Sequence, residues 1–315
     1  ARYCDAHDLD FYSVRRQVNE RIRQADRANE DPDSVPSGGL LVPTVGVGGH
    51  CLPKDGILLW WRKLEAGGDT GGSLILEART INDESPGSTL KLAERRFGDY
   101  RNGKVALLGV AYRFNSEDTR NSPTLALARI LEDQGVEFSL HDPYVHPGDQ
   151  NLERYGMSGR FTGDLDQALD GAQTIIICAA HTEYREGFER WRGHAALARG
   201  ILDACHLFPG GELEGFPHSG MGRGHTEPSP EFVDFVERSF HAVERGVANE
   251  VAALAEFLNA RYAPDRFSRA RMDEIRRLAG TCITGCDIVE PGPVKDVPAF
   301  DGFRSRLAHP LPPSP

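Results

Sequence analysis

The sequence predicts an α/β protein whose core is a doubly wound parallel sheet, with helical regions before and after it. Between residues 102 and 224, short apolar runs alternate with amphipathic segments, as in a parallel sheet covered by helices on both faces. Before residue 102, apolar residues recur three and four positions apart, which is typical of helices. After residue 228, a Ser-Pro pair opens a long segment of helical periodicity.

Composition excludes several classes of protein. A chain of 315 residues suits about two domains, and 39% hydrophobic residues are enough to build cores. No apolar run approaches the ~20 residues that span a bilayer, and the first residues do not form a signal peptide. We therefore expect a cytoplasmic protein with no membrane partner. A net charge of −11 argues against nucleic-acid binding, which needs a basic surface.

The region before residue 102 is predicted to be mostly helical. Residues 1 to about 30 look helical, with a charged face, and the Pro-, Gly- and Ser-rich stretch after them reads as a loop. A glycine-rich turn then leads to Cys51. The loop is predicted at 31–43, the turn at 44–50, and further helices at 57–64, 74–82 and 88–97.

The sheet is predicted from four buried strands with helices between them. The helix that starts at Ser229 repeats its apolar residues to Leu258, about eight turns, and so long a stripe usually packs on another helix or a partner subunit. The Pro-rich end reads as a disordered or loosely attached tail. The strands are predicted at 104–109, 136–140, 174–178 and 200–203, the helices at 122–133 and 164–170, and the tail at 291–315. We divide the chain into a helical region (1–101), an α/β domain (102–224) and a helical extension (225–315).

The six cysteines are too scattered for a disulfide framework. Cys178 lies in a predicted strand and is interpreted as a packing residue. Cys282 and Cys286 are separated by three residues, but no second pair of ligands follows. No metal site is therefore predicted.

Cys51 has a different setting from the other cysteines. Glycines before it let the backbone approach a ligand closely. A helix N-terminus and Lys54 both favour the thiolate, the nucleophilic form. Asp55 lies one helical turn on, where a carboxylate could position a water or accept a proton. The alternative is a glycine-rich turn with a buried cysteine.

Two segments resemble one known family. Gly46–Asp55, GVGGHCLPKD, resembles the active-site segment of the UDP-glucose/GDP-mannose dehydrogenases, and Gly109–Pro123, GVAYRFNSEDTRNSP, is similar to the segment that opens their C-terminal domain. Together with further matches in the family's order and spacing, they cover about residues 1–224. These further matches are Arg79–Asn82, His141–Tyr144, a strand followed by His181, Asp203, and Gly220–Gly224.

The resemblance implies oxidation of the C6 alcohol of a UDP-sugar to a carboxylate, with two NAD reduced. Cys51 would hold the aldehyde as a thiohemiacetal and then a thioester, and Asp55 would assist the hydrolytic water. The α/β domain would bind the uridine diphosphate, and the protein would form a homodimer or higher oligomer. The resemblance also assigns cofactor contacts to Lys54 and Arg120, and substrate contacts to Gly46, Gly48, Gly49 and Arg113, where the family usually has Lys.

The sequence departs from the family at further points. Ala204 and Cys205 replace a Gly-Arg pair, which weakens the case for ordinary uracil or ribose contacts. No GxGxxG occurs, so we expect the family's NAD domain to precede Ala1 and this chain to be a C-terminal portion, inactive alone. His50 before the cysteine favours UDP-N-acetyl-mannosamine as substrate. A UDP-glucose dehydrogenase, a non-catalytic UDP-sugar-binding module and a truncated remnant stay open.

Overall fold

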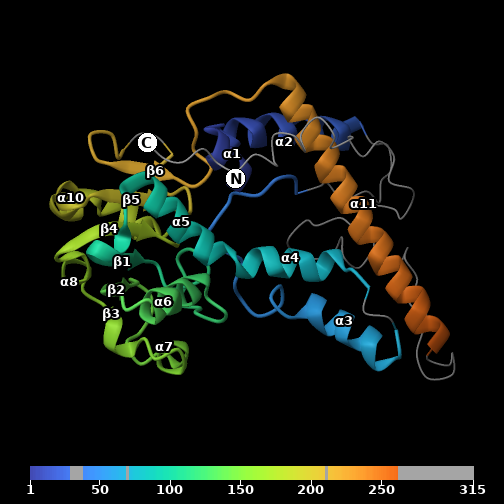
Figure 1. Ribbon diagram of the computed structural model, residues 1–315, viewed down its shortest axis with the longest axis horizontal. Helices are drawn as coiled ribbons and strands as arrows, with labels where there is room; N and C mark the ends of the chain where they lie inside the picture. The colour runs from blue at the N-terminus through green and yellow to red at the C-terminus, as the bar shows by residue number, and fades with distance from the viewer. Residues whose placement is uncertain (29–37, 69–70, 210–211, 262–315) are drawn as a thin grey trace. The chain divides into compact units, whose positions relative to one another are not determined.

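A computed structural model describes residues 1–28, 38–68, 71–209 and 212–261 (Figure 1). The chain divides into two compact units. The first unit holds residues 1–12 and 41–227, and the second holds 13–40 and 228–315. The predicted tail at 291–315 lies outside the described residues, and so do Cys282 and Cys286.

The first unit is built on a six-stranded parallel sheet with strand order β3-β2-β1-β4-β5-β6. The chain builds outward from β1 to β3 on one side and from β4 to β6 on the other, so the winding reverses between β1 and β4. The predicted doubly wound α/β fold is confirmed. The strands are β1 (Lys104–Leu108), β2 (Phe138–His141), β3 (Phe161–Thr162), β4 (Ala172–Ile177), β5 (Gly200–Asp203) and β6 (His218–Gly220).

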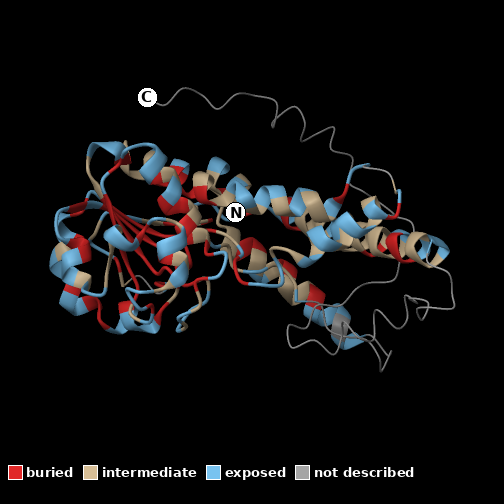
Figure 2. Cartoon of the chain, turned by 90° about the horizontal axis from the view of Figure 1, so that it is seen from below, coloured by how far each residue is buried: buried red, intermediate tan, exposed pale blue. Residues whose placement is uncertain are grey.

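Alternate residues of β1 enter two separate cores, because successive side chains of a strand point to opposite faces. Val105 and Leu107 pack in one core with helices α5 and α6, whereas Ala106 and Leu108 pack in the other with α8, α9 and α10. Figure 2 shows the strands buried between these helices. The helices of this sheet are α5 (Ser85–Phe97), α6 (Pro123–Asp133), α7 (Gln150–Arg154), α8 (Leu165–Leu169), α9 (Thr182–Glu186) and α10 (Phe188–Leu197).

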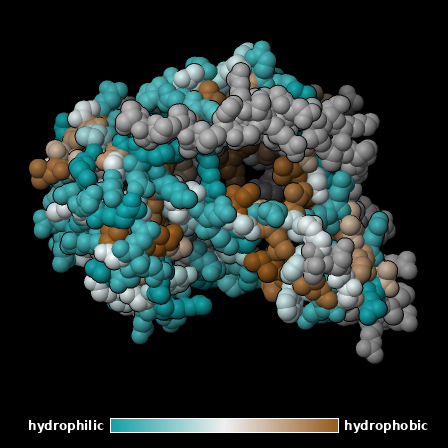
Figure 3. All heavy atoms as spheres, viewed as in Figure 1, coloured by the Kyte–Doolittle hydropathy of each residue, from teal (hydrophilic) through white to brown (hydrophobic). Residues whose placement is uncertain are grey.

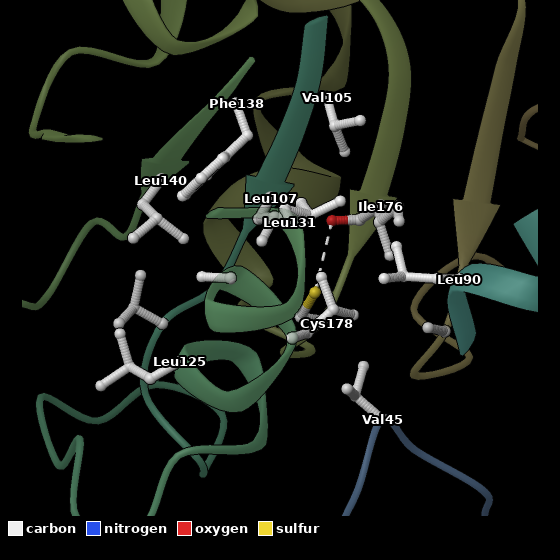
Figure 4. Packing of buried hydrophobic residues seen from close by; sticks show 14 of the residues in the cluster. Val45, Leu90, Val105, Leu107, Leu125, Leu131, Phe138, Leu140, Ile176 and Cys178 are labelled. Atoms are coloured by element: carbon white, nitrogen blue, oxygen red, sulfur yellow. Dashed lines mark hydrogen bonds between the residues drawn. The ribbon is translucent and has the colours of Figure 1, made fainter. Parts of the chain in front are cut away.

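Cys178 follows β4 and packs in the first of these cores (Figure 4). Its Sγ lies 3.6 Å from the carbonyl oxygen of Ile176, and Leu90 of α5 and Val45 belong to the same cluster. Burial raises the pKa of this thiol to about 12, so it stays protonated and unreactive. The interpretation of Cys178 as a packing residue is confirmed.

The prediction that residues 1 to about 30 are helical is confirmed, and the helical stretch is divided into two elements. The structure has two helices, α1 (Arg2–His7) and α2 (Phe11–Ala28), with Asp8 between them in a left-handed conformation, φ 54°. Leu9 pairs with Thr226 in an isolated parallel bridge, which turns the chain away from the helical path. The two helices that follow the cysteine segment are α3 (Asp55–Glu65) and α4 (Leu74–Asp83), and their bounds agree with the predicted ones within two residues.

The helical region before the sheet shares a core with it. Leu90, Leu92 and Ala93 of α5 are buried in the same cluster as the inward residues of β1, β2 and β4. The compact units therefore do not divide after residue 101. The three-region division of the chain stays a prediction.

The second unit contains most of α2 and the long helix α11 (Pro230–Arg261). The Ser229 Oγ accepts a hydrogen bond from the Phe232 N–H at 3.3 Å, so the helix start predicted from Ser-Pro is confirmed. Arg21 of α2 pairs with Glu237 of α11 at 2.6 Å, so these two helices contact each other. None of the described helices has the length and apolar character needed to cross a membrane.

Gly109→Ala is expected to destabilise the first unit by about 2–4 kcal/mol, from left-handed strain plus overpacking. Gly109 has φ 97°, and a Cβ there would lie 2.7 Å from the backbone nitrogen of Ala179. Gly135→Ala is the matched control, because Gly135 has φ 69° with nothing within 4 Å of the added carbon. Urea unfolding measures both, and equal losses would contradict the steric argument.

Candidate functional site

Cys51 lies in the turn that precedes α3. Its carbonyl oxygen accepts the N–H of Lys54 at 3.1 Å and the N–H of Asp55 at 2.9 Å, so Asp55 is one turn away, as predicted. The Lys54 Nζ forms an ion pair with the Asp55 carboxylate. The Cys51 side chain is exposed, so the alternative of a turn with a buried cysteine is wrong.

The other cysteines in the described part of the chain are buried. Burial raises the pKa of the thiols of Cys4, Cys178 and Cys205, which disfavours their thiolate forms. Within these described residues, Cys51 is therefore the thiol that is placed to reach an electrophile from solvent.

The glycines before Cys51 are required by contact with this chain's own loop after β1. A Cβ at Gly48 would lie 2.6 Å from the Tyr112 Cβ and 2.7 Å from the Asn121 carbonyl oxygen. Gly49 has φ 93°, and a Cβ there would lie 3.0 Å from the Tyr112 ring; a Cβ at Gly46 would meet Pro123 at 3.1 Å. The close approach predicted for a ligand is thus an approach to Tyr112 and its neighbours. Substrate contact by Gly46, Gly48 and Gly49 stays a prediction.

Hydrogen bonds hold the glycine segment on two sides. The Gly49 N–H donates to the Arg120 carbonyl at 2.8 Å, and the Asn121 side-chain amide donates to the Gly49 carbonyl at 2.8 Å. On the other side, the Val47 N–H donates to the Asn82 Oδ1 at 2.6 Å, and the Asn82 Nδ2 donates back to the Val47 carbonyl at 3.3 Å.

Sequence reasoning gave no role to Asn82 or Asn121. Both lie in segments that carried the family resemblance, which was the available signal. Their side chains hold the backbone beside Cys51, and no periodicity argument could have paired residues this far apart in sequence.

Arg120 lies close to Cys51 but is paired with a neighbouring carboxylate. Its guanidinium makes hydrogen bonds with both oxygens of Asp118, at 2.5–3.1 Å. Asp118 raises the pKa of Arg120, and the backbone hydrogen bond from Gly49 places Arg120 beside the cysteine segment. Contact of Arg120 or Lys54 with a cofactor stays a prediction.

A hollow of about 590 Å³ opens at the carboxyl edge of the sheet. Residues 113–117, from the loop after β1, form one wall, and Tyr144, after β2, forms the other. In open α/β sheets, ligands bind at this edge near the point where the winding reverses, and small-molecule pockets are of this size. Arg113 lines the hollow, so the structure places one predicted substrate residue in a pocket.

Asp203, another residue of the matched motifs, has a structural role at the end of β5. Its carboxylate accepts the N–H groups of Cys205, Leu207 and Phe208 at 2.9–3.3 Å. The Cys205 side chain is buried in the second core, so position 205 points away from solvent in this chain.

A smaller hollow of about 260 Å³ lies beside the cysteine segment, bounded by Val47, Pro53, Arg79 and Asn121 among others. Leu52, Leu58 and Trp61, in the cysteine turn and on α3, are 54–77% exposed; Figure 3 shows apolar atoms in brown on this face. Within the described residues, no cluster of three or more His, Cys, Asp or Glu side chains could hold a metal ion.

The chain is similar to nucleotide-sugar dehydrogenases. Residues 106–208 match the family model described as the UDP-glucose/GDP-mannose dehydrogenase family, UDP binding domain. Over 201 residues the chain is 32% identical to the UDP-N-acetyl-D-mannosamine dehydrogenase of Pyrococcus horikoshii, and over 177 residues it is 33% identical to that of Methanocaldococcus jannaschii. The crystal structure of an NDP-N-acetyl-D-galactosaminuronic acid dehydrogenase from Methanosarcina mazei Go1 matches 70% of this chain with a TM-score of 0.50 and 25% identity.

These matches cover part of each protein. They span 62% and 56% of this chain but only 44% and 36% of the two curated relatives, and 50% of the solved structure. The chain thus spans about half the length of the proteins that it matches, or less.

Proposed function

We propose that the chain is the UDP-sugar-binding and thiol-bearing part of a UDP-N-acetyl-D-mannosamine dehydrogenase, because residues 106–208 match the UDP binding domain of the UDP-glucose/GDP-mannose dehydrogenase family. The observation that carries the proposal is the interlock of two loops. The exposed Cys51 follows glycines that are packed on Tyr112, and the next residue after Tyr112 begins the wall of the 590 Å³ hollow.

The chemistry assigned to these residues is covalent capture and hydrolysis. The Cys51 thiolate adds to the C6 aldehyde carbon, and the aldehyde oxygen takes up a proton to give a thiohemiacetal. After a two-electron oxidation to the thioester, water attacks the carbonyl carbon, the thiol leaves, and the carboxylate is formed. Asp55, one turn from Cys51, accepts the proton of that water.

NAD is the oxidant that the family resemblance implies, and the turn after β1 lacks the glycine pattern of a dinucleotide site. The turn after β1 continues from Gly109 as Val110, Ala111 and Tyr112, without the glycines that let a dinucleotide pyrophosphate approach the backbone. Arg120 is paired with Asp118. No hydride transfer is therefore assigned to these residues.

Calorimetric titration of the chain tests the proposal. UDP and UDP-N-acetyl-mannosamine are expected to bind, and GDP-mannose is expected to bind more weakly. Tighter binding of UDP-glucose would favour the second candidate, a UDP-glucose 6-dehydrogenase, which the description of the matched family includes. No binding of any UDP-sugar would remove the proposal.

A second assay separates the catalytic part from a complete enzyme. The chain is mixed with NAD and UDP-sugars, and the absorbance of the reduced cofactor is followed. Binding without turnover is the expected result. Steady turnover would contradict the expectation that the chain alone is inactive.

Arg113→Gln is expected to weaken UDP binding by about tenfold, since a charged hydrogen bond to a phosphate contributes about 1.5–3 kcal/mol and solvent exposure reduces that value. Calorimetry at fixed ionic strength measures the change. Arg129→Gln is the control, because Arg129 is an exposed cation on α6 that pairs with Asp133. Equal weakening by both variants would show a general charge effect instead of a phosphate contact.

A further inference from the structure

We propose that Asp142 and His181 are a buried positioning pair that holds both walls of the 590 Å³ hollow and thereby sets the affinity of the chain for UDP. The inference rests on the proposed function for its ligand. Its geometric part concerns the walls alone and is tested without any ligand.

The pair is fixed in one tautomer. Both side chains are 0% exposed, and the His181 Nε2 lies 3.0 Å from the Asp142 Oδ2. The His181 Nδ1 accepts the backbone N–H of Asn115 at 2.8 Å. Because Nδ1 is an acceptor there, Nε2 carries the hydrogen and donates it to Asp142.

The first wall of the hollow is attached to this imidazole. Asn115 lies in the middle of the wall and has a left-handed backbone, φ 50°. Besides its N–H bond to His181, its Oδ1 accepts the N–H of Thr182 at 2.9 Å and the Thr182 hydroxyl at 3.3 Å. Two consecutive residues after β4 thus hold one residue of the loop after β1.

The second wall is attached to the carboxylate. The Asp142 Oδ1 accepts the N–H groups of Tyr144 at 2.9 Å and Val145 at 3.2 Å. Its Oδ2 accepts those of Val110 at 2.7 Å and Ala111 at 2.9 Å, where the first loop leaves β1. The Tyr144 ring centroid lies 5.1 Å from that of His181.

One pair therefore joins the ends of β1, β2 and β4 at the reversal of the winding. Any shift of the imidazole moves the Asn115 backbone, and with it the wall that carries Arg113. We infer that the pair acts through the walls and does not itself touch the ligand, since its side chains are fully buried.

Two substitutions of His181 each remove one of its two hydrogen bonds and keep the other. In His181→Asn, the amide oxygen takes the place of Nδ1 and can still accept the Asn115 N–H, but the bond to Asp142 is lost. In His181→Gln, the amide nitrogen takes the place of Nε2 and can still donate to Asp142, but Asn115 loses its acceptor. UDP dissociation constants are measured by calorimetry, and thermal midpoints are measured on the same samples.

We expect His181→Gln to weaken UDP binding about tenfold or more, and His181→Asn to keep it within about threefold although it costs more stability. Ser139→Ala is the control, because Ser139 donates a buried hydrogen bond to the Ala168 carbonyl, outside the residues that line the hollow. A role in folding alone would make affinity fall in step with the thermal midpoint in all three variants, and that result would overturn the proposal.

Amide hydrogen exchange without ligand tests the walls independently. Residues 109–117 are expected to exchange faster in His181→Gln than in His181→Asn, and unchanged exchange in both would overturn the inference. If the wild-type chain does not bind UDP but exchange is still faster in His181→Gln than in His181→Asn, the proposed function fails and the positioning role stands. If the His181 variants do not fold, Asn115→Gly replaces them, since Asn115 is exposed and has a left-handed backbone. Faster exchange of residues 109–117 is expected in this variant, and unchanged exchange would contradict the inference.

Discussion

Cys51→Ser is expected to abolish formation of the sugar carboxylate by the proposed dehydrogenase. Removing the nucleophile of a covalent mechanism can cost up to about 10⁶ in kcat, and we expect a loss of at least about 10³ here. A hydroxyl at this position is a much weaker nucleophile than a thiolate and cannot form the thioester. Oxidation to the aldehyde needs no thiol, so the yield of reduced NAD per sugar should fall from two to at most one. Product analysis by mass spectrometry and cofactor absorbance measure the two quantities.

Cys4→Ala is the matched control, since Cys4 is a buried thiol in the same compact unit. It should leave carboxylate formation unchanged. In the chain alone, UDP-sugar binding should slow alkylation of Cys51 by iodoacetamide. Wild-type rates of carboxylate formation in Cys51→Ser would rule out the nucleophile role.

Asp142→Asn is expected to destabilise the first unit by about 3–5 kcal/mol at neutral pH, because several buried donors would lose their acceptor and each unsatisfied buried donor costs about 1–3 kcal/mol. The carboxylate accepts four backbone N–H groups and the His181 Nε2–H. An amide nitrogen in place of one oxygen would face those donors with another donor. Urea unfolding at pH 7 measures the loss.

The loss of stability in Asp142→Asn should depend on pH in one direction. Burial alone would raise the pKa of Asp142, but the hydrogen bond from His181 and those from the backbone donors hold it below its ordinary value. A lowered folded-state pKa stabilises the fold above the unfolded pKa, and the stabilisation is lost as pH falls through the folded pKa. The difference in the free energy of unfolding between the wild type and Asp142→Asn should therefore become smaller below about pH 4. Asp133→Asn, an exposed ion-pair partner on α6, should show little loss at any pH.

The long, regular elements of the fold follow from local pattern. The apolar runs of β1, β4 and β5 are buried on both faces, and α6 carries both its Ser122 cap and its proline at the first turn. The strands β3 and β6 have two and three residues, too few for a periodicity to be read, and they exist through pairing with β2 and β5. The break at Asp8 likewise depends on Thr226, which no local window contains.

The candidate site was likewise predictable from the sequence only in part. Motif and spacing placed the glycine segment and Cys51 before a helix, and Asp55 one turn on from Cys51, as the structure has them. The contacts that position them come from Asn82, Tyr112 and Asn121, which are distant in sequence and carry no chemical signature of their own. The buried pair of Asp142 and His181 was visible only as two separate motif fragments.

The interlock of Gly48 with Tyr112 also limits how related genes can be recombined. Because a single added carbon at position 48 would overlap both Tyr112 and the Asn121 carbonyl, the two loops must be inherited together. A chimaera that exchanges residues 44–55 with a homologue while keeping the loop 109–123 should lose solubility or thiol reactivity unless both parents share these contacts. Crossover points for substrate engineering are therefore better placed outside this pair of loops.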